Sequence, residues 1–244
     1  MKYGILGDIH SNLSALQAVL QCFERESVET VISVGDVVGY GAAPIECIEL
    51  VQSVGAHVVK GNHDAACVDE IDIVYFNSYA QDAVNWTKSV LSKEHFDWLS
   101  SLPLTIDLEH CSVAHGTLHK PELFDYIQST ADGDPSLDAM ERPVCFVGHT
   151  HVPVSLVRLR DDPNRTAYTF DYAVDLSETR KALINVGSVG QPRDEEPRAA
   201  YAIFDSDEQL VQIKRTEYDI EVEAKRIRDA GLPPMLADRL YLGV

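Results

Sequence analysis

The apolar positions in the first 150 or so residues fall into short, β-branched runs separated by stretches with helical spacing. Runs of this kind are typical of buried strands, which we predict at residues 3–7, 30–35, 57–61, 112–116 and 144–149. A helix is expected between the first two runs, because apolar residues recur at helical spacing at Leu13, Leu16, Leu20 and Phe23. Ser11 or Asn12 is its expected N-cap.

Two further helical segments precede residue 110. Residues 43–55 predict a helix that Gly55 closes, and residues 75–100 have a helical pattern that includes both tryptophans. The first half of the chain therefore alternates strands with helices, as α/β proteins do.

The pattern changes after residue 150, where strand-like runs follow one another without a strong helix. They span residues 152–160, 166–176, 182–188, 199–205 and 209–218. The tail at 221–240 returns to helix and is broken by Gly231 and the Pro233–Pro234 pair. Alternation followed by a strand cluster predicts a layered α/β fold with a mixed sheet or two packed sheets. No repeat or linker is evident, so residues 1–244 are interpreted as one domain.

Composition narrows the functional classes. The formal charge of −19 argues against general binding to nucleic-acid backbone, which needs a concentrated basic face. No apolar run is long enough to span a membrane, and the N-terminal segment lacks a cleavage signal, so a cytoplasmic protein is expected. The cysteines are odd in number and widely spaced, which favours buried thiols over disulfides at Cys22, Cys47, Cys67, Cys111 and Cys145. The acidic runs at 131–134, 161–162 and 194–196 are expected to be solvated loops.

Nearly every predicted strand of the first half ends in glycine or alanine next to residues that can bind metal. The segments are GDIH at 7–10, GD at 35–36, GNHD at 61–64, AHG at 114–116 and GHTH at 148–151. Sites in open α/β sheets gather outside the C-terminal strand ends, so these segments are predicted to meet. Five of the nine histidines fall in these segments, which packing alone does not explain. Taken singly, each piece has an ordinary interpretation: Asp8 as a turn residue before a helix, GD as a turn and His115 as a core histidine.

The residue types indicate which metals fit. Carboxylate, imidazole and amide groups without thiolate suit borderline divalent ions such as Mn, Fe, Co, Ni or Zn. The candidate ligands are too many for one ion, whereas a shared carboxylate would let them hold two: Asp8, His10, Asp36, Asn62, His115, His149 and His151. Bound cations would also make the site positive in a protein whose net charge is −19.

The order D-x-H, G-D, G-N-H-D, H, G-H-x-H resembles the calcineurin-like metallophosphoesterase superfamily. The segments 35–50 and 185–205 look like its small bacterial branch of phosphodiesterases and dinucleoside-polyphosphate hydrolase-like proteins. The resemblance implies a four-layer α/β/β/α sandwich of two mixed sheets, with a dinuclear metal site at strand C-terminal ends. Manganese is the expected ion, with Fe, Ni, Co or Zn as alternatives.

The resemblance also implies roles for individual residues. The first metal would be held by Asp8, His10, Asp36 and His151. Asp36 would bridge to a second metal completed by Asn62, His115 and His149. His63 would not bind metal but would protonate the leaving oxygen, with Asp64 orienting its ring.

Substrate contacts are expected from the turn-rich loop at 187–194 and from positions beside the metal motifs. Arg193 is the best candidate for a bidentate phosphate contact, with Ser188 and Gln191 as further candidates. Val186 replaces the proline usual in the family, and the loop also has a purely structural interpretation as a reversal between strands. Asn12 and Tyr40 are candidates as well, although Asn12 fits a helix N-cap at least as well.

The sequence thus predicts a hydrolase that cleaves small-molecule phosphate mono- or diesters. A metal-bridging hydroxide would attack phosphorus in line while His63 acts as general acid. A catalytically silent scaffold is the alternative from another class, and it would be expected to lose His63 or metal ligands. A metal hydrolase acting on C–N bonds fits the H-x-H pair but not the GNHD segment. Oligomeric state, native substrate and the choice between mono- and diesters stay open.

Overall fold

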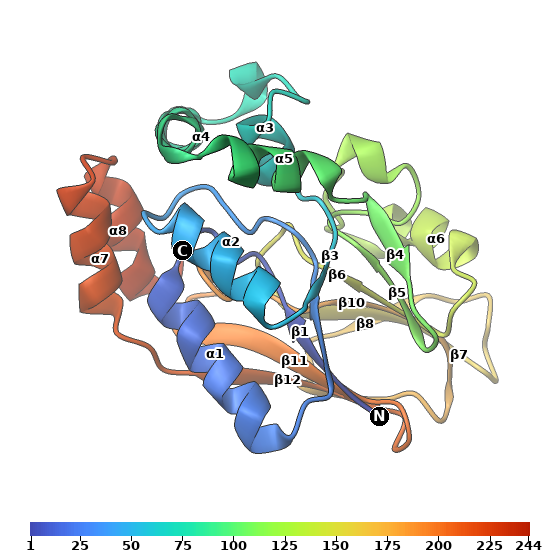
Figure 1. The fold of residues 1–244 in the computed structure, drawn as a ribbon. Coiled ribbons are helices and arrows are strands. Elements are labelled where there is room, and N and C mark those ends of the chain that lie inside the picture. Colours follow the sequence, from blue (N-terminus) through green and yellow to red (C-terminus); the bar gives the residue numbers. More distant parts are fainter.

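Two six-stranded mixed sheets lie face to face in the computed structural model, which describes all 244 residues (Figure 1). The first sheet has the order β3 (His57–Val58), β2 (Thr30–Ser33), β1 (Lys2–Leu6), β11 (Ala199–Asp205), β12 (Leu210–Thr216) and β9 (Ala173–Asp175). The second has the order β4 (Thr105–Asp107), β5 (Cys111–Ala114), β6 (Val144–Val147), β10 (Thr179–Asn185), β7 (Val154–Leu159) and β8 (Ala167–Thr169).

Each sheet contains a parallel core of three strands. Strands β1, β2 and β3 are parallel to one another, as are β5, β6 and β10, and the other pairings are antiparallel. Strand β1 pairs with β11 in a register that places Lys2 opposite Asp205 and Leu6 opposite Tyr201. The C-terminal ends of the parallel strands in each sheet therefore share one edge.

Alternation along the strands divides the core into layers. Tyr3 and Ile5 of β1 face the second sheet and pack with Phe146 of β6, in a cluster that fills the space between the sheets. Leu6 points the other way, into the cluster beneath α1 (Leu13–Glu26). This alternation is the period-two pattern of a strand that is buried on both faces.

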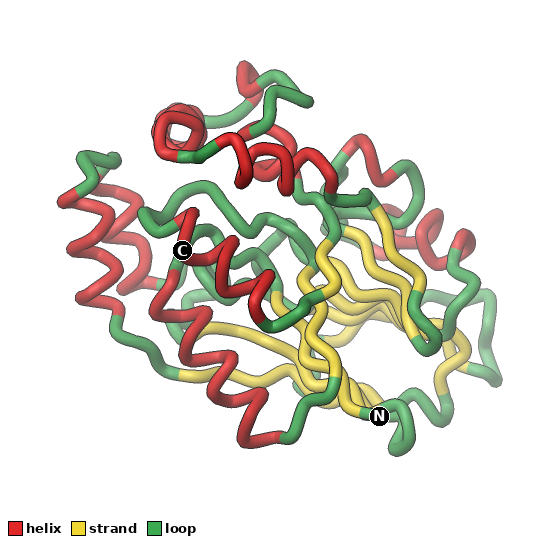
Figure 2. Tube along the Cα trace, viewed as in Figure 1, coloured by secondary structure: helices red, strands yellow, loops and turns green.

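Helices cover both outer faces of the paired sheets, as the tube in Figure 2 shows. Helices α1 and α2 (Pro44–Ser53) pack on the first sheet, and α6 (Thr130–Ala139) packs on the second. The others are α3 (Asn62–Cys67), α4 (Ser78–Val90), α5 (Lys93–Ser101), α7 (Ile220–Asp229) and α8 (Pro234–Leu242), with short 3₁₀ turns at Ile73–Tyr75 and Pro121–Leu123. The predicted α/β/β/α arrangement is confirmed. None of the helices combines the length and apolar character needed to cross a bilayer.

Several local predictions are also confirmed. Asn12 caps α1, because its side-chain oxygen accepts the backbone N–H of Ala15 at 3.0 Å. The tail forms two helices that separate at Gly231 and the two prolines. All five cysteines are free and buried, in helices or strands.

Two predictions were wrong. The acidic run 131–134 is part of α6 and not a loop, because Ser129 accepts the N–H of Asp132 and the Asp132 carboxylate accepts the N–H of Gln128. Acidic residues in a first helical turn are stabilised by the helix dipole. The strand predicted at 57–61 stops at Val58, and the GNHD segment that follows opens helix α3.

Candidate metal centre

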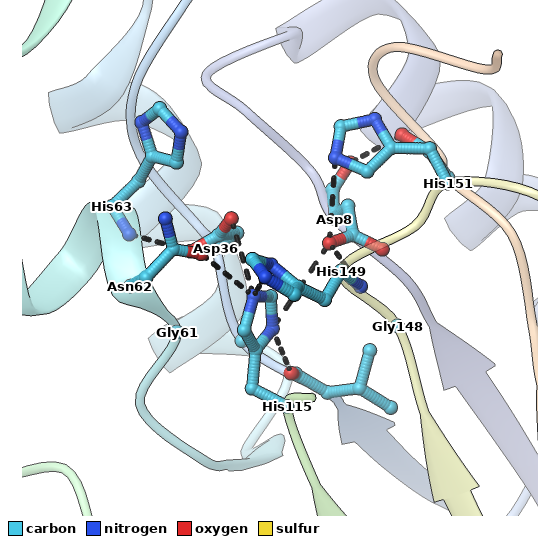
Figure 3. A network of polar contacts seen from close by, with 12 residues as sticks. Asp8, Asp36, Gly61, Asn62, His63, His115, Gly148, His149 and His151 are labelled. Carbon is cyan, nitrogen blue, oxygen red and sulfur yellow. Dashed lines mark hydrogen bonds and ion pairs between the residues drawn. The ribbon is translucent and has the colours of Figure 1, made fainter. Parts of the chain in front are cut away.

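All seven predicted ligand side chains lie just beyond the C-terminal ends of parallel strands, and the structure brings them together. Figure 3 labels all of them except His10. One group contains Asp8, His10, Asp36 and His151, and a second contains Asp36, His115 and His149. In each group the potential ligand atoms lie within 4.8 Å of one another. The amide oxygen of Asn62 joins the second group, 3.0 Å from Nε2 of His115. Asp36 is the only residue common to both groups.

The backbone at these positions is unusual. Five of the clustered residues have positive φ angles: Asp8 (34°), His10 (47°), Asp36 (52°), His149 (70°) and His151 (63°). Residues other than glycine rarely adopt this conformation, which costs on the order of 1–3 kcal/mol each and persists only where the surrounding structure enforces it. The sharp reversals that follow the strands therefore turn these side chains towards a common centre.

Backbone carbonyl groups fix three of the rings. Nδ1 of His10 donates to the Val38 carbonyl at 3.0 Å. In the same way, Nδ1 of His115 donates to the Val34 carbonyl at 2.8 Å and Nδ1 of His151 donates to the Gln191 carbonyl at 2.6 Å. A carbonyl only accepts, so Nδ1 carries the hydrogen and the neutral ring presents a lone pair at Nε2.

The positions of these lone pairs indicate whether the site fits a metal ion. Nε2 of His10 is 3.0 Å from Nε2 of His151, so two lone pairs oppose each other there. Nε2 of His115 is 3.0 Å from Nδ1 of His149, where a cation or a proton on His115 is needed between the two nitrogens. Oδ2 of Asp8 is buried and has no hydrogen-bond partner. Opposed lone pairs and an unsatisfied buried carboxylate oxygen need a cation between them. The donor set of imidazole, carboxylate and amide groups fits divalent transition metals.

The pKa values of the clustered residues also indicate that the site favours a cation. Burial raises the pKa of Asp8 to about 7 and lowers the pKa of His149 to about 3. Burial also acts to lower the pKa of His115, but Asp36 and Asp8 outweigh it and raise that pKa to about 9. A proton on His115 thus occupies the place where a cation is favoured, and a divalent ion would supply that charge more completely.

Glycines give the carboxylates room. A Cβ on Gly61 would lie 2.1 Å from Oδ1 of Asp36, and one on Gly148 would lie 2.5 Å from Oδ2 of Asp8. Any side chain at either position would therefore displace a candidate ligand.

We expect Gly148→Ala to weaken metal binding by about 10–100-fold, because the methyl group pushes the Asp8 carboxylate aside. Calorimetric titration of metal-stripped protein measures the effect. Gly133→Ala is the matched control: its methyl group would meet Leu156 at 2.3 Å in another part of the core and should leave metal affinity unchanged. Equal affinities in the two variants would contradict this role of Gly148.

His63 lies beside the cluster on α3, buried but without a hydrogen bond at Nδ1. Its ring centroid is 4.4 Å from that of Tyr40, 4.9 Å from His10 and 5.0 Å from Phe76. Burial lowers the pKa of His63 to about 4, so the ring is neutral near pH 7. Its backbone N–H donates to Oδ1 of Asp36 at 2.8 Å, which ties His63 to the shared carboxylate.

Asp64 supports His63 by a route that differs from the predicted one. Its carboxylate does not hydrogen-bond to the imidazole; it accepts the N–H of Gly61 at 2.9 Å and the N–H of Val38 at 3.2 Å. Asp64 therefore fixes the start of α3 and joins it to the loop after β2. It positions His63 through the backbone.

Three of the five predicted substrate-binding side chains form hydrogen bonds within the protein: Asn12, Ser188 and Gln191. Asn12 caps α1 and donates to the Gly190 carbonyl at 2.9 Å. The Ser188 hydroxyl donates to the Asp8 carbonyl at 2.8 Å and accepts the N–H of Gln191, while the Gln191 side chain accepts from Arg193. These contacts hold the loop after β10 against the loop after β1.

The other two predicted residues lie together at the edge of the site. Tyr40 contacts His10 and His63 through ring edges and faces, and the guanidinium carbon of Arg193 is 5.6 Å from the Tyr40 ring centroid. Arg193 is partly exposed, whereas Tyr40 is buried and reaches the site through its place in the wall of a cleft.

A cleft of about 720 Å³ opens beside His63, Asn62 and His149. We call it the aromatic cleft, after Tyr40, Tyr75, Phe76, Phe124 and Tyr126 in its walls. Tyr126 stacks on His149 with ring centroids 3.9 Å apart, and Tyr75 is 94% exposed. The sequence pattern indicated Tyr40 but missed the other four aromatics, because they come from irregular segments around the short 3₁₀ turns.

The fold and the cluster define a class: layered α/β/β/α proteins with a candidate metal centre at shared strand ends. The chain belongs to the calcineurin-like phosphoesterase superfamily, whose domain model matches residues 1–209.

Three relatives illustrate this membership. A metallophosphoesterase from Sphaerobacter thermophilus is 40% identical, with a TM-score of 0.87 over 100% of this chain and 99% of that one. An uncharacterized protein of Methanocaldococcus jannaschii is 36% identical over 98% of this chain and 97% of its own length. The phosphodiesterase YfcE of Escherichia coli K12 is 26% identical over 85% of this chain and 89% of its own.

Proposed function

We propose that this protein is a metal-dependent phosphoesterase that hydrolyses phosphate mono- or diesters, with His63 as general acid. The observation that carries the proposal is the pair of ligand groups that share Asp36, because Asn62 and His149 of the second group line the aromatic cleft beside His63. Membership in a phosphoesterase superfamily supports the same reaction class.

The seven clustered residues would hold the metal, and Asp36 would be shared between the two groups. Two divalent ions held there would lower the pKa of a bound water and offset the charge of the phosphoryl group. The chain itself supplies the fixed orientation, since carbonyl groups lock His10, His115 and His151 in the tautomer that a ligand requires.

His63 is proposed to donate a proton to the leaving oxygen. It lies outside both ligand groups but contacts His10 and Tyr40, and Nδ1 has no partner within the protein. Burial keeps the ring neutral in the ligand-free protein, and a phosphate anion opposite it favours the protonated form. Phosphoryl transfer depends mainly on positioning and charge stabilisation, to which such an acid adds.

The aromatic cleft supports esters with a bulky, flat substituent. Two segments, Ile71–Ala80 and Glu122–Tyr126, contribute residues to its walls and so determine its width. Stacking against Tyr75, Phe76 or Tyr126 would hold such a substituent next to His63. We therefore propose a preference for diesters with an aromatic group over small alkyl monoesters.

A substrate panel tests the proposal. Metal-stripped protein is assayed with Mn, Fe, Co, Ni or Zn added separately, on aryl and alkyl phosphate mono- and diesters and on dinucleoside polyphosphates. Metal-dependent release of product, fastest with aryl diesters, is the expected result. Retention of bound metal without hydrolysis of any ester would contradict the proposal and favour the scaffold alternative.

Metal removal should also destabilise the fold, because it leaves the opposed lone pairs of His10 and His151 and the buried Asp8 oxygen unsatisfied. At a free metal concentration about 100 times the Kd, binding stabilises a protein by about 2.7 kcal/mol. We therefore expect chelation to lower the Tm by roughly 5–10 °C. Thermal unfolding with and without chelator measures this, and an unchanged Tm would show that the cluster binds no metal.

A further inference from the structure

A second cleft, of about 600 Å³, borders the GHTH segment at Thr150. We call it the lateral cleft, and its lining comprises Ile127–Thr130, then Thr150, Val152, Val154 and Leu156 along β7 and the turn before it, and Tyr168 and Phe170 at β8. Its volume lies in the range of small-molecule sites, which is about 300–1,000 Å³. Neither the candidate metal centre nor the aromatic cleft shares a lining residue with it.

Two large apolar side chains of the lateral cleft are exposed to solvent. Tyr168 is 61% exposed and Phe170 is 64% exposed, and their rings meet edge to face with centroids 5.7 Å apart. Strand β8 is the edge of the second sheet, and Tyr168 pairs with Leu156 of β7, which packs against α6. The helix therefore covers the sheet as far as Leu156 and leaves the rings beside it uncovered. Adjacent exposed aromatic rings are typical of a binding surface.

No charged side chain lines the lateral cleft, although charged residues make up 24% of the chain. Its apolar residues are accompanied only by neutral polar ones: Gln128, Ser129, Thr130 and Thr150. A phosphate group would lose its hydration there without gaining a counter-charge. A flat, uncharged group would instead stack on the rings of Tyr168 and Phe170. The lining therefore favours an uncharged aromatic ligand.

Consecutive residues separate the lateral cleft from the aromatic cleft. Tyr126 and His149 line the aromatic cleft, whereas Ile127 and Thr150, the next residues along the chain, line the lateral cleft. Neighbouring residues have Cα atoms about 3.8 Å apart. The rings of Tyr126 and His149 also stack on each other, with centroids 3.9 Å apart. The two clefts therefore adjoin along this pair of segments.

The same segments bring the lateral cleft to the candidate metal centre. Thr150 lies between His149 and His151, which belong to different ligand groups. Its hydroxyl accepts the side-chain N–H of Asn185 at 2.9 Å, which holds the segment against the end of β10. A phosphoryl group bound at the metal centre would therefore have one cleft beside His149 and a second cleft one residue further along the chain.

We propose that the lateral cleft binds the second aromatic substituent of a phosphodiester whose first aromatic substituent occupies the aromatic cleft. The inference rests on the proposed phosphoesterase function and deepens it, because the preferred diesters then carry a flat, uncharged group on both alcohols. Stacking on Tyr168 and Phe170 holds the second group while the phosphoryl oxygens stay at the metal centre. A monoester can fill only one of the two clefts and is the poorer ligand.

Equilibrium binding to metal-loaded protein tests the lateral cleft without relying on turnover. The probes are dibenzylphosphinate and benzyl(methyl)phosphinate, two anions that contain no ester bond and differ by one aromatic ring. Calorimetry on wild-type protein should show tighter binding of dibenzylphosphinate. Phe170→Ala should reduce that preference by about 2–10-fold, the range for one aromatic contact, and leave the affinity for benzyl(methyl)phosphinate unchanged. Phe170→Trp should keep the preference, because it retains a flat ring.

Tyr172→Ala is the matched control, because Tyr172 is 58% exposed in the same segment but does not line the lateral cleft. It should leave both affinities unchanged. Equal binding of the two phosphinates by wild-type protein, or an equal loss for both in Phe170→Ala, would overturn the proposal.

Sedimentation of the wild-type and Phe170→Ala proteins tests the other occupant that exposed rings allow, a second copy of this chain. A wild-type dimer that becomes a monomer in Phe170→Ala would assign the rings to an interface and overturn the proposal, whereas the same oligomeric state in both proteins supports it. Any of these contrary results leaves the proposed function standing if wild-type protein hydrolyses phosphoesters. Absence of hydrolysis counts against the function alone.

Discussion

Replacement of Asp36 by asparagine is expected to remove bound metal from both ligand groups and to lower kcat by at least about 10²–10³-fold. Asp36 is the one residue that both groups contain. Its Oδ2 lies 3.5 Å from Nε2 of His10 and 3.4 Å from Nε2 of His115, so it faces ligands of each group. An amide at this position has no charge and can present only one oxygen, so neither group keeps its shared carboxylate.

Metal content per folded chain, measured by elemental analysis, tests this expectation together with turnover. Glu223→Gln is the control, because Glu223 is also a buried carboxylate, but it binds Ser14 and Arg226 outside both ligand groups. That variant should lose some stability and keep its metal. Full retention of two metals by Asp36→Asn would show that Asp36 does not bridge.

His63→Gln is expected to lower kcat by about 10²–10⁴-fold while metal content stays near that of the wild type. His63 is outside both ligand groups, so its loss removes a proton donor and not a ligand. The acid form of His63 is the form lost as pH rises through its pKa, which burial lowers. The alkaline decline of kcat/KM that this group causes should therefore be absent in the variant.

The pH profile separates this role from a structural one. A variant with disturbed packing would lose rate at every pH and keep the shape of the profile. His119→Gln is the control, because His119 is exposed in a loop outside the aromatic cleft. An His63→Gln enzyme with wild-type kcat would refute the assignment of His63 as the acid.

The sequence predicted the fold and the ligand cluster well, for a physical reason. Asp8, Asp36 and His149 each follow a short buried run, and parallel strands bring the ends of such runs to one edge. The ends of these strands can be located from the sequence, because the spacing of apolar residues in a short segment indicates whether it forms a buried strand.

Sequence patterns could not predict the features that depend on contacts between distant segments. The role of Asp64 depends on the N–H of Val38, which belongs to another loop, so proximity to His63 in the sequence was misleading. The aromatic cleft likewise depends on how two irregular segments face each other.

The pairing of β1 with β11 has a consequence for the order of assembly. Asp8 and His10 leave the ribosome early, but β11 and the loop that holds Asp8 through Ser188 are synthesised far later. Contacts between such distant segments form late and slowly, because a long loop must close first. The nascent chain therefore presents scattered candidate ligands without a site until β1 and β11 have paired. A cofactor would meet these ligands in the correct geometry only after that pairing.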